Sequence, residues 1–163
     1  MGYRSTMDNL APDKSLGFNV RRAHRAFDRL LNANLMRHKL STGFWYYLRV
    51  LWIDNGLTQK ELSKRNNVTE NTTTSTVLSM TREGLVTRER DADDNRKRIV
   101  RLTPKALKLR TLLLPYARQV NEVARRNIST EELDICLDVL KRMSANLEAE
   151  LTAFNLDDSV PEA

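Results

Sequence analysis

The amino-acid sequence predicts a mainly α-helical protein with one small two-stranded β-hairpin. Apolar residues recur at three-and-four spacing along residues 13–36, 104–126 and 130–154, the pattern of amphipathic helices. Only residues 85–90 and 98–102 alternate and are β-branched as strands are. Five glycines and four prolines in 163 residues are too few for a strand-rich sandwich with many tight turns.

The helices outside the centre of the chain differ in how apolar they are. The segment 44–54 is aromatic or aliphatic almost all round, so we expect it to be buried on most sides. Thr103-Pro104 predicts the start of the next helix, because proline at the first helical position loses no hydrogen bond. The last helix carries a nearly continuous leucine stripe, and the single cysteine, Cys136, lies on it, where we expect a buried apolar filler.

The centre of the chain predicts two short helices followed by the hairpin. Thr58 and Glu61 form a capping box, and the first helix ends near Arg65 at an Asn66-Asn67 turn. Thr69 can cap the second helix, which we expect to bury Val77, Leu78 and Met80 and to end at Gly84. Helix, turn, helix and hairpin in this order predict a winged helix-turn-helix.

The positive charge is concentrated in this region. The formal net charge is +6, and residues 82–110 hold ten basic against five acidic residues. A clustered basic patch indicates a polyanionic partner, whereas the alternative is a solvated charged face. Eight of the thirteen residues 69–81 are Ser or Thr, which suit a major groove by hydrogen-bonding phosphates and base edges.

The central motifs resemble the MarR family of bacterial winged-helix regulators. The likeness runs through GLTQKELS (56–63), the Thr-rich helix, REGLVTRERD (82–91) and DNRKRIVRLTPKAL (94–107), and extends over roughly residues 15–152. The wing signature of the family is met by Asp94, Arg96, Val100, Leu102 and Thr103. Pro104-Lys105-Ala106 departs from the glycine that members usually carry soon after Leu-Thr.

The resemblance implies a homodimer that binds double-stranded DNA. Residues 13–40 and 104–154 would form the helical dimerisation region, 41–103 the DNA-binding domain, and 1–12 and 155–163 flexible ends. The helix 69–82 would enter the major groove and Arg96 the minor groove, with Asp94 holding a wing arginine. We expect a repressor on a palindromic operator, with DNA contacts from Gln59, Lys60, Thr69, Asn71, Thr72, Thr73, Thr74, Ser75, Thr76, Ser79, Arg82, Arg88, Arg90, Asp94, Arg96, Lys97 and Arg98.

Such regulators are commonly released from DNA by a small, often aromatic, anionic effector. Trp45, Arg49 and Trp52 share one helix face by their spacing, so a carboxylate could be gripped between indoles. We expect an aromatic carboxylate or its coenzyme A thioester to bind at Arg22, His24, Arg25, Trp45, Tyr46, Arg49 and Trp52. The alternative is that Arg49 reaches solvent or pairs with an acid while the aromatic residues are only core.

Other classes of function find little support in the sequence. There is no Gly-rich phosphate loop, G-x-S-x-G or HExxH, so we expect neither an enzyme nor a cofactor. His24 and His38 have no companion ligands at metal-site spacing, so we expect no metal. With no apolar span or secretory signal, we expect a cytoplasmic protein. The alternative function is an effector-independent DNA-architectural or protein-interaction module.

Overall fold

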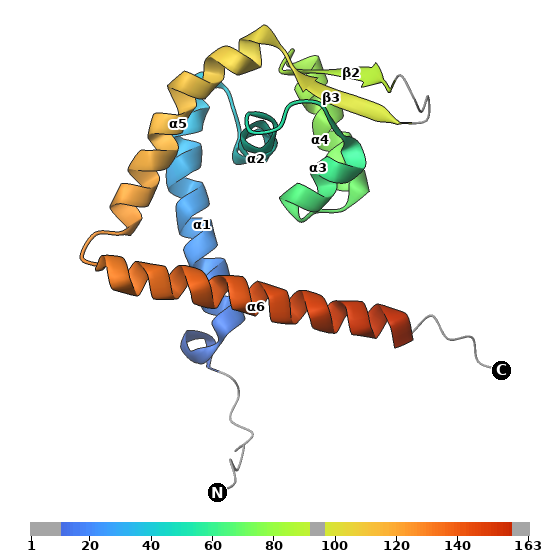
Figure 1. The fold of residues 1–163 in the computed structure, drawn as a ribbon. Coiled ribbons are helices and arrows are strands. Elements are labelled where there is room, and N and C mark those ends of the chain that lie inside the picture. The colour runs from blue at the N-terminus through green and yellow to red at the C-terminus, as the bar shows by residue number, and fades with distance from the viewer. Residues whose placement is uncertain (1–10, 92–96, 158–163) are drawn as a thin grey trace, which may run out of the picture. The chain divides into compact units, whose positions relative to one another are not determined.

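The computed structural model describes residues 11–91 and 97–157, with side chains as far as residue 154 (Figure 1). It divides into two compact units, Met1–Val120 and Asn121–Ala163. The expected flexible ends fall largely outside the described residues, although helix continues through residue 157. No helix among the described residues is long and apolar enough to cross a membrane.

The elements follow the expected order, with three short additions, η1, η2 and β1. In chain order, the elements are η1 (Pro12–Lys14), α1 (Leu16–Leu35), η2 (Met36–His38), α2 (Thr42–Leu51), β1 (Leu57–Thr58), α3 (Gln59–Asn66), α4 (Glu70–Arg82), β2 (Val86–Arg90), β3 (Arg98–Leu102), α5 (Pro104–Ala124) and α6 (Thr130–Asp157), where η marks a short 3-10 helix.

The sheet has three strands instead of the two that were predicted. Its order is β1-β3-β2, and both pairings are antiparallel. The two-residue strand β1 places Leu57 opposite Val100 and Thr58 opposite Ile99. The predicted two-strand sheet was therefore incomplete. The strand β1 has only two residues, too few to show the alternation of apolar and polar side chains, and its partner β3 lies about forty residues later in the sequence.

Local sequence signals set the limits of α3 and α4. Thr58 and Glu61 form the predicted capping box, with the Thr58 amide donating to Glu61 at 2.8 Å. Asn67 ends α3 with φ 52°, and Gly84 follows α4 with φ 65°, the left-handed region that these residues tolerate. Thr69 caps α4 by accepting from the Thr72 amide. These predictions are confirmed.

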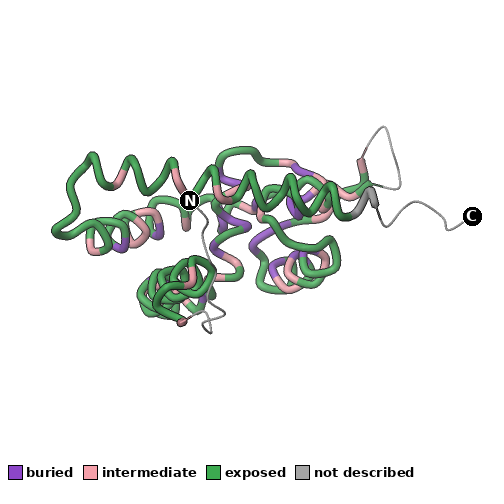
Figure 2. Tube along the Cα trace, turned by 90° about the horizontal axis from the view of Figure 1, so that it is seen from below, coloured by how far each residue is buried: buried purple, intermediate pink, exposed green. Residues whose placement is uncertain are grey.

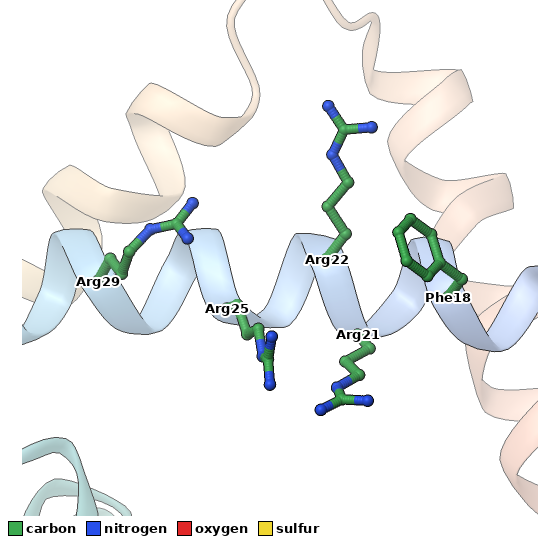
Figure 3. Close-up of a pocket in the computed structure, with 5 residues that line it drawn as sticks. All are labelled: Phe18, Arg21, Arg22, Arg25 and Arg29. Atoms are coloured by element: carbon green, nitrogen blue, oxygen red, sulfur yellow. The ribbon is translucent and has the colours of Figure 1, made fainter. Parts of the chain in front are cut away.

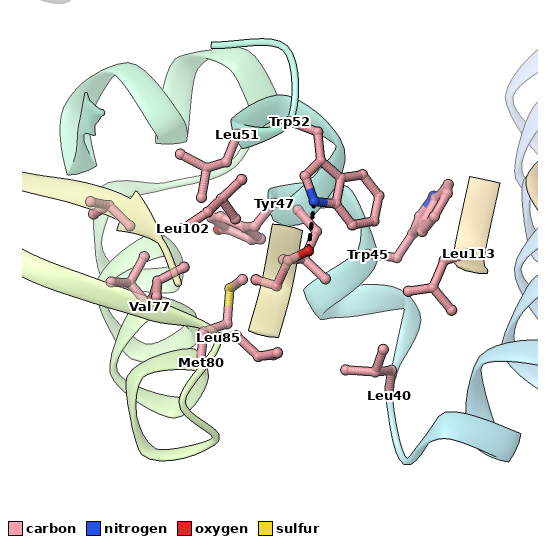
Figure 4. Close-up of a cluster of buried hydrophobic side chains, with 14 of the residues drawn as sticks. Leu40, Trp45, Tyr47, Leu51, Trp52, Val77, Met80, Leu85, Leu102 and Leu113 are labelled. Atoms are coloured by element: carbon pink, nitrogen blue, oxygen red, sulfur yellow. Dashed lines mark hydrogen bonds between the residues drawn. The ribbon is translucent and has the colours of Figure 1, made fainter. Parts of the chain in front are cut away.

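The hydrophobic core lies in the first unit and joins α2 to the winged helix-turn-helix (Figure 4). Trp52 donates from its indole nitrogen to the Ala106 carbonyl at 3.0 Å, which fixes α2 to the start of α5. Trp45 packs edge to face on Trp52 with ring centroids 5.7 Å apart. The α2 segment thus forms the central helix of this core, as its composition predicts.

The helix α6, by contrast, has no buried residue along the part whose side chains are described, as Figure 2 also shows. Six of its large apolar residues are exposed, namely Ile135, Leu137, Leu140, Leu147, Leu151 and Phe154. Cys136 is exposed as well, so its prediction as a buried filler is wrong for the single chain. An isolated helix with an exposed apolar stripe has nothing within its own unit to cover it.

Candidate nucleic-acid interface

One face of α4 is free of the core and carries mostly short polar side chains. Val77 and Met80 are fully buried on the inner face, which sets the rotation of the helix. The opposite face follows from helical spacing and presents Asn71, Thr72, Ser75, Leu78 and Arg82, all exposed. This exposed stripe is the surface that α4 offers to a groove.

Two residues of α4 are placed differently from the prediction. Thr73, expected to contact DNA, is fully buried, and its hydroxyl lies 3.0 Å from the Tyr47 hydroxyl in the core. Leu78, expected inside, is 38% exposed on the outer face. Both assignments were wrong, because a run of similar Ser and Thr side chains does not show which face of the helix turns toward the core. Leu78 is a candidate contact that sequence reasoning missed, since an apolar side chain can touch a thymine methyl.

Several hydroxyls on α4 already donate their protons to the helix backbone. Ser75 and Thr76 donate to the Thr72 carbonyl at 3.0 and 2.9 Å, and Ser79 donates to the Ser75 carbonyl at 3.1 Å. A hydroxyl group that already donates its proton to the backbone can act toward other molecules only as a hydrogen-bond acceptor. In these rotamers the helix surface suits base-edge donors, such as the amino groups of adenine and cytosine, better than phosphate oxygens.

A second set of residues connects the hairpin to both helices of the motif. The Arg88 guanidinium, on β2, donates to the Gln59 amide oxygen at 3.4 Å, and Gln59 donates to the Thr74 hydroxyl at 3.4 Å. The Arg88 Nε is buried and has no hydrogen-bond partner among the described residues. Gln59, Thr74 and Arg88 therefore lie between α3, α4 and β2 in an arrangement that positions these elements.

The outer residues of the hairpin form its basic side. Arg90 and Arg98 are register partners on β2 and β3, and Lys97, which directly precedes β3, is exposed. Lys60, at the start of α3, is exposed too. Asp94 and Arg96 lie outside the described residues, so their expected roles stay predictions. The remaining predicted contacts, Thr69 and Arg82, are exposed at the two ends of α4.

The predicted effector residues separate into a buried and an exposed group. Trp45 and Trp52 are 2% and 7% exposed and pack within the core, whereas Arg49 is exposed. Because the two indoles contact each other and the Trp52 indole donates to the Ala106 carbonyl, they do not form a surface on either side of Arg49. Arg22, His24 and Arg25 are exposed on α1.

The exposed group includes a hydrogen-bonded contact between α1 and α2. Tyr46 donates to Asp28 at 2.7 Å, and His24 lies 3.4 Å from the other oxygen of that carboxylate. Burial, followed by this hydrogen bond to Asp28, raises the pKa of Tyr46 to about 12. Arg49 follows Tyr46 by three residues on α2 and therefore lies on the same side of that helix, and its charge acts in the opposite direction on the Tyr46 pKa. His24, Asp28, Tyr46 and Arg49 therefore form one polar cluster.

Comparisons with known proteins agree with this geometry. The family model of the MarR family matches residues 40–97. The HTH-type transcriptional regulator TtmR of Methylorubrum extorquens is 34% identical over 144 residues, spanning 88% of this chain and 73% of that protein.

Solved structures share the whole architecture. A MarR protein from Peptoclostridium difficile matches with a TM-score of 0.79 at 23% identity, covering 94% of this chain and 97% of that one. BpsR of Bordetella bronchiseptica, whose DNA binding is regulated by 6-hydroxynicotinic acid, matches with a TM-score of 0.76 at 19% identity, covering 85% and 97%. At these identities, the two structures show that the fold is the same.

Proposed function

Since the chain belongs to the MarR family of transcriptional regulators, we propose that it is a ligand-responsive repressor that binds a palindromic operator as a homodimer in the cytoplasm. The observation that carries this proposal is the exposed polar stripe of α4 beside the basic hairpin. A helix with few charges reads base edges, while arginines on the neighbouring hairpin bind phosphates.

The proposed homodimer rests on the exposed apolar residues of α1 and α6. Leu147 is 70% exposed, Leu151 61% and Phe154 66%, and on α1 Leu16 is 69% exposed. On α6, Leu147, Leu151 and Phe154 follow each other at four-and-three spacing, and an exposed apolar stripe of this kind marks an interaction site. Two identical subunits related by a twofold axis would read an inverted repeat whose half-site centres lie about 10 base pairs apart.

We place the effector at the exposed polar cluster and no longer between the tryptophans. Arg49 can pair with a carboxylate, and Tyr46 and His24 supply a ring and a hydrogen-bonding nitrogen beside it. The proposed effector is an aromatic carboxylate or an aromatic acyl-CoA. The similarity to BpsR, which responds to 6-hydroxynicotinic acid, supports the first of these classes.

DNA binding is tested by footprinting on the DNA flanking the gene, because regulators of this kind commonly act on a neighbouring operon. We expect a protected inverted repeat and an affinity that falls steeply with salt. Arg96→Ala and Arg98→Gln should weaken binding, whereas Arg118→Gln, an exposed arginine of α5, should not. Protection of one isolated half-site or an affinity independent of salt would contradict the proposal.

The effector is tested by titrating the protein–operator complex with aromatic acids and their coenzyme A thioesters. A releasing compound should act on the wild type and fail on Arg49→Gln, because that variant removes the partner of the anion but no DNA contact. His24→Ala should weaken the response less, since a neutral imidazole offers only a hydrogen bond. If no compound releases the wild type, the alternative of an effector-independent DNA-architectural module gains support.

A further inference from the structure

A row of four arginines on α1 includes Arg22 and Arg25, which were predicted to bind the effector, and two further arginines, Arg21 and Arg29, that no function described so far uses. Arg21, Arg22, Arg25 and Arg29 line a cavity of about 250 Å³ together with Phe18 (Figure 3). Arg22, Arg25 and Arg29 follow each other at three-and-four spacing, and Arg21 precedes Arg25 by four, so the four positions lie within about 100° of the helix circumference. We call this set the arginine row.

The guanidinium groups of the arginine row have no acidic partner in the part of the chain that the structure describes. Among the described residues, no ion pair or hydrogen bond engages any of the four side chains. Asp28, the one acid of α1, receives its hydrogen bond from Tyr46 and pairs with His24. Four full positive charges are thus available to an anion.

The spacing of the row opposes helix stability. Arg21 and Arg25, and Arg25 and Arg29, are four residues apart, so equal charges lie on successive turns. Like charges at this spacing destabilise a helix. An anion bound across them removes the repulsion, so the row is better explained by a ligand than by the folding of α1.

The proposed dimer would leave the row accessible. At 100° per residue, Leu16, Val20 and Phe27 lie on the side of α1 opposite the arginines. These three apolar residues are exposed, and we expect a second subunit to cover them. The arginine row therefore faces away from that contact.

The length and chemistry of the row define the class of ligand. Arg21 and Arg29 are separated by about 12 Å along the axis, from the helical rise per residue, which exceeds the size of one carboxylate. Guanidinium groups bind phosphate oxygens in pairs, and Phe18 offers a ring one turn away for stacking on a base.

We propose that the arginine row is a binding site for a nucleotide with adjacent phosphate groups, such as the adenosine diphosphate part shared by ADP and coenzyme A. The row borders the polar cluster, because Arg21 and Arg25 lie three residues before His24 and Asp28, respectively, on α1. In the acyl-CoA form of the proposed effector, the row would hold the nucleotide end. That last step rests on the proposed function, whereas nucleotide binding itself does not.

The test is calorimetric titration of the full-length protein with ADP, coenzyme A, tripolyphosphate and adenosine. We expect the first three to bind and adenosine not to bind. The double variant Arg21→Gln/Arg25→Gln should lose about tenfold or more in affinity, since charge-assisted hydrogen bonds are lost. The control Arg118→Gln/Arg126→Gln, with the same change of charge at exposed positions beyond α1, should bind as the wild type does.

Three results would overturn the proposal. The first is that neither ADP nor coenzyme A binds to the wild type. The second is that the control variant loses as much nucleotide affinity as the α1 variant. The third is that the α1 variant loses as much operator affinity as Arg98→Gln, which would make the row a DNA contact. If coenzyme A binds at the row but neither it nor any thioester releases DNA, the site stands and its link to the effector fails. Operator binding by the wild type is measured separately, so a failure of the proposed regulator function can be distinguished from a failure of the proposed nucleotide site.

Discussion

Thr72 and Thr73 show how adjacent residues of one helix take different roles. The Thr73 hydroxyl is fully buried against Tyr47, while Thr72 is exposed on the outer face of α4. Thr73→Val should lower the free energy of unfolding by about 1 kcal/mol, because it leaves a buried tyrosine hydroxyl without its partner. Thr72→Ala should change the preferred bases and leave stability nearly unchanged. Urea unfolding and binding to single-base operator variants check both, and a changed base preference in Thr73→Val would contradict the assignment.

Arg98 and Gln59 should also differ in how they affect DNA binding. Arg98 is on the basic hairpin, whereas Gln59 contacts Arg88 and Thr74 and acts by positioning them. Arg98→Gln should reduce the slope of log affinity against log salt by about one, because one phosphate contact is lost. Gln59→Ala should weaken binding at every salt concentration with an unchanged slope. A reduced slope in Gln59→Ala would instead make that residue a phosphate contact.

Between elements, the hydrogen bond from Tyr46 to Asp28 connects α2 to α1. The pKa of Tyr46 is raised from 10.0 to about 12, by burial first and by Asp28 second. A raised tyrosine pKa adds stability that is fully present below pH 10 and is lost as the pH rises through 12. Asp28→Asn should therefore lower the Tyr46 pKa part of the way toward 10 and reduce this loss. Tyrosine-resolved NMR titration measures it, with Tyr46→Phe identifying the resonance; an unchanged pKa would exclude Asp28 as a cause.

For the whole molecule, the central prediction is that the protein is a dimer. Leu147→Asp places a charge in the apolar stripe of α6 and should convert a dimer to a monomer at micromolar concentration, because an apolar interface does not tolerate an unpaired carboxylate. Sedimentation measures this directly. The control is Ile53→Asp, since Ile53 is 82% exposed after α2 and outside the predicted interface. A wild type that sediments as a stable monomer would contradict both the dimer and the inverted repeat.

The sequence by itself determined the features that depend on a few neighbouring residues. The capping box at Thr58, the left-handed turn at Asn67 and the glycine after α4 are all present as predicted, because each is a local hydrogen-bond or φ requirement. The order of helices and the β2–β3 hairpin follow from periodicity for the same reason.

Tertiary structure alone decided which face of each helix meets the core. It buried Thr73 and exposed Leu78, because the phase of α4 is set by packing against α2 and α3 and not by its near-uniform Ser and Thr residues. It drew Trp45 and Trp52 into the core, since the Ala106 carbonyl that holds the Trp52 indole comes from a segment fifty-four residues later. A contact between two distant segments produces no periodic pattern in the sequence of either segment. For this physical reason, such contacts can be identified only in the folded structure.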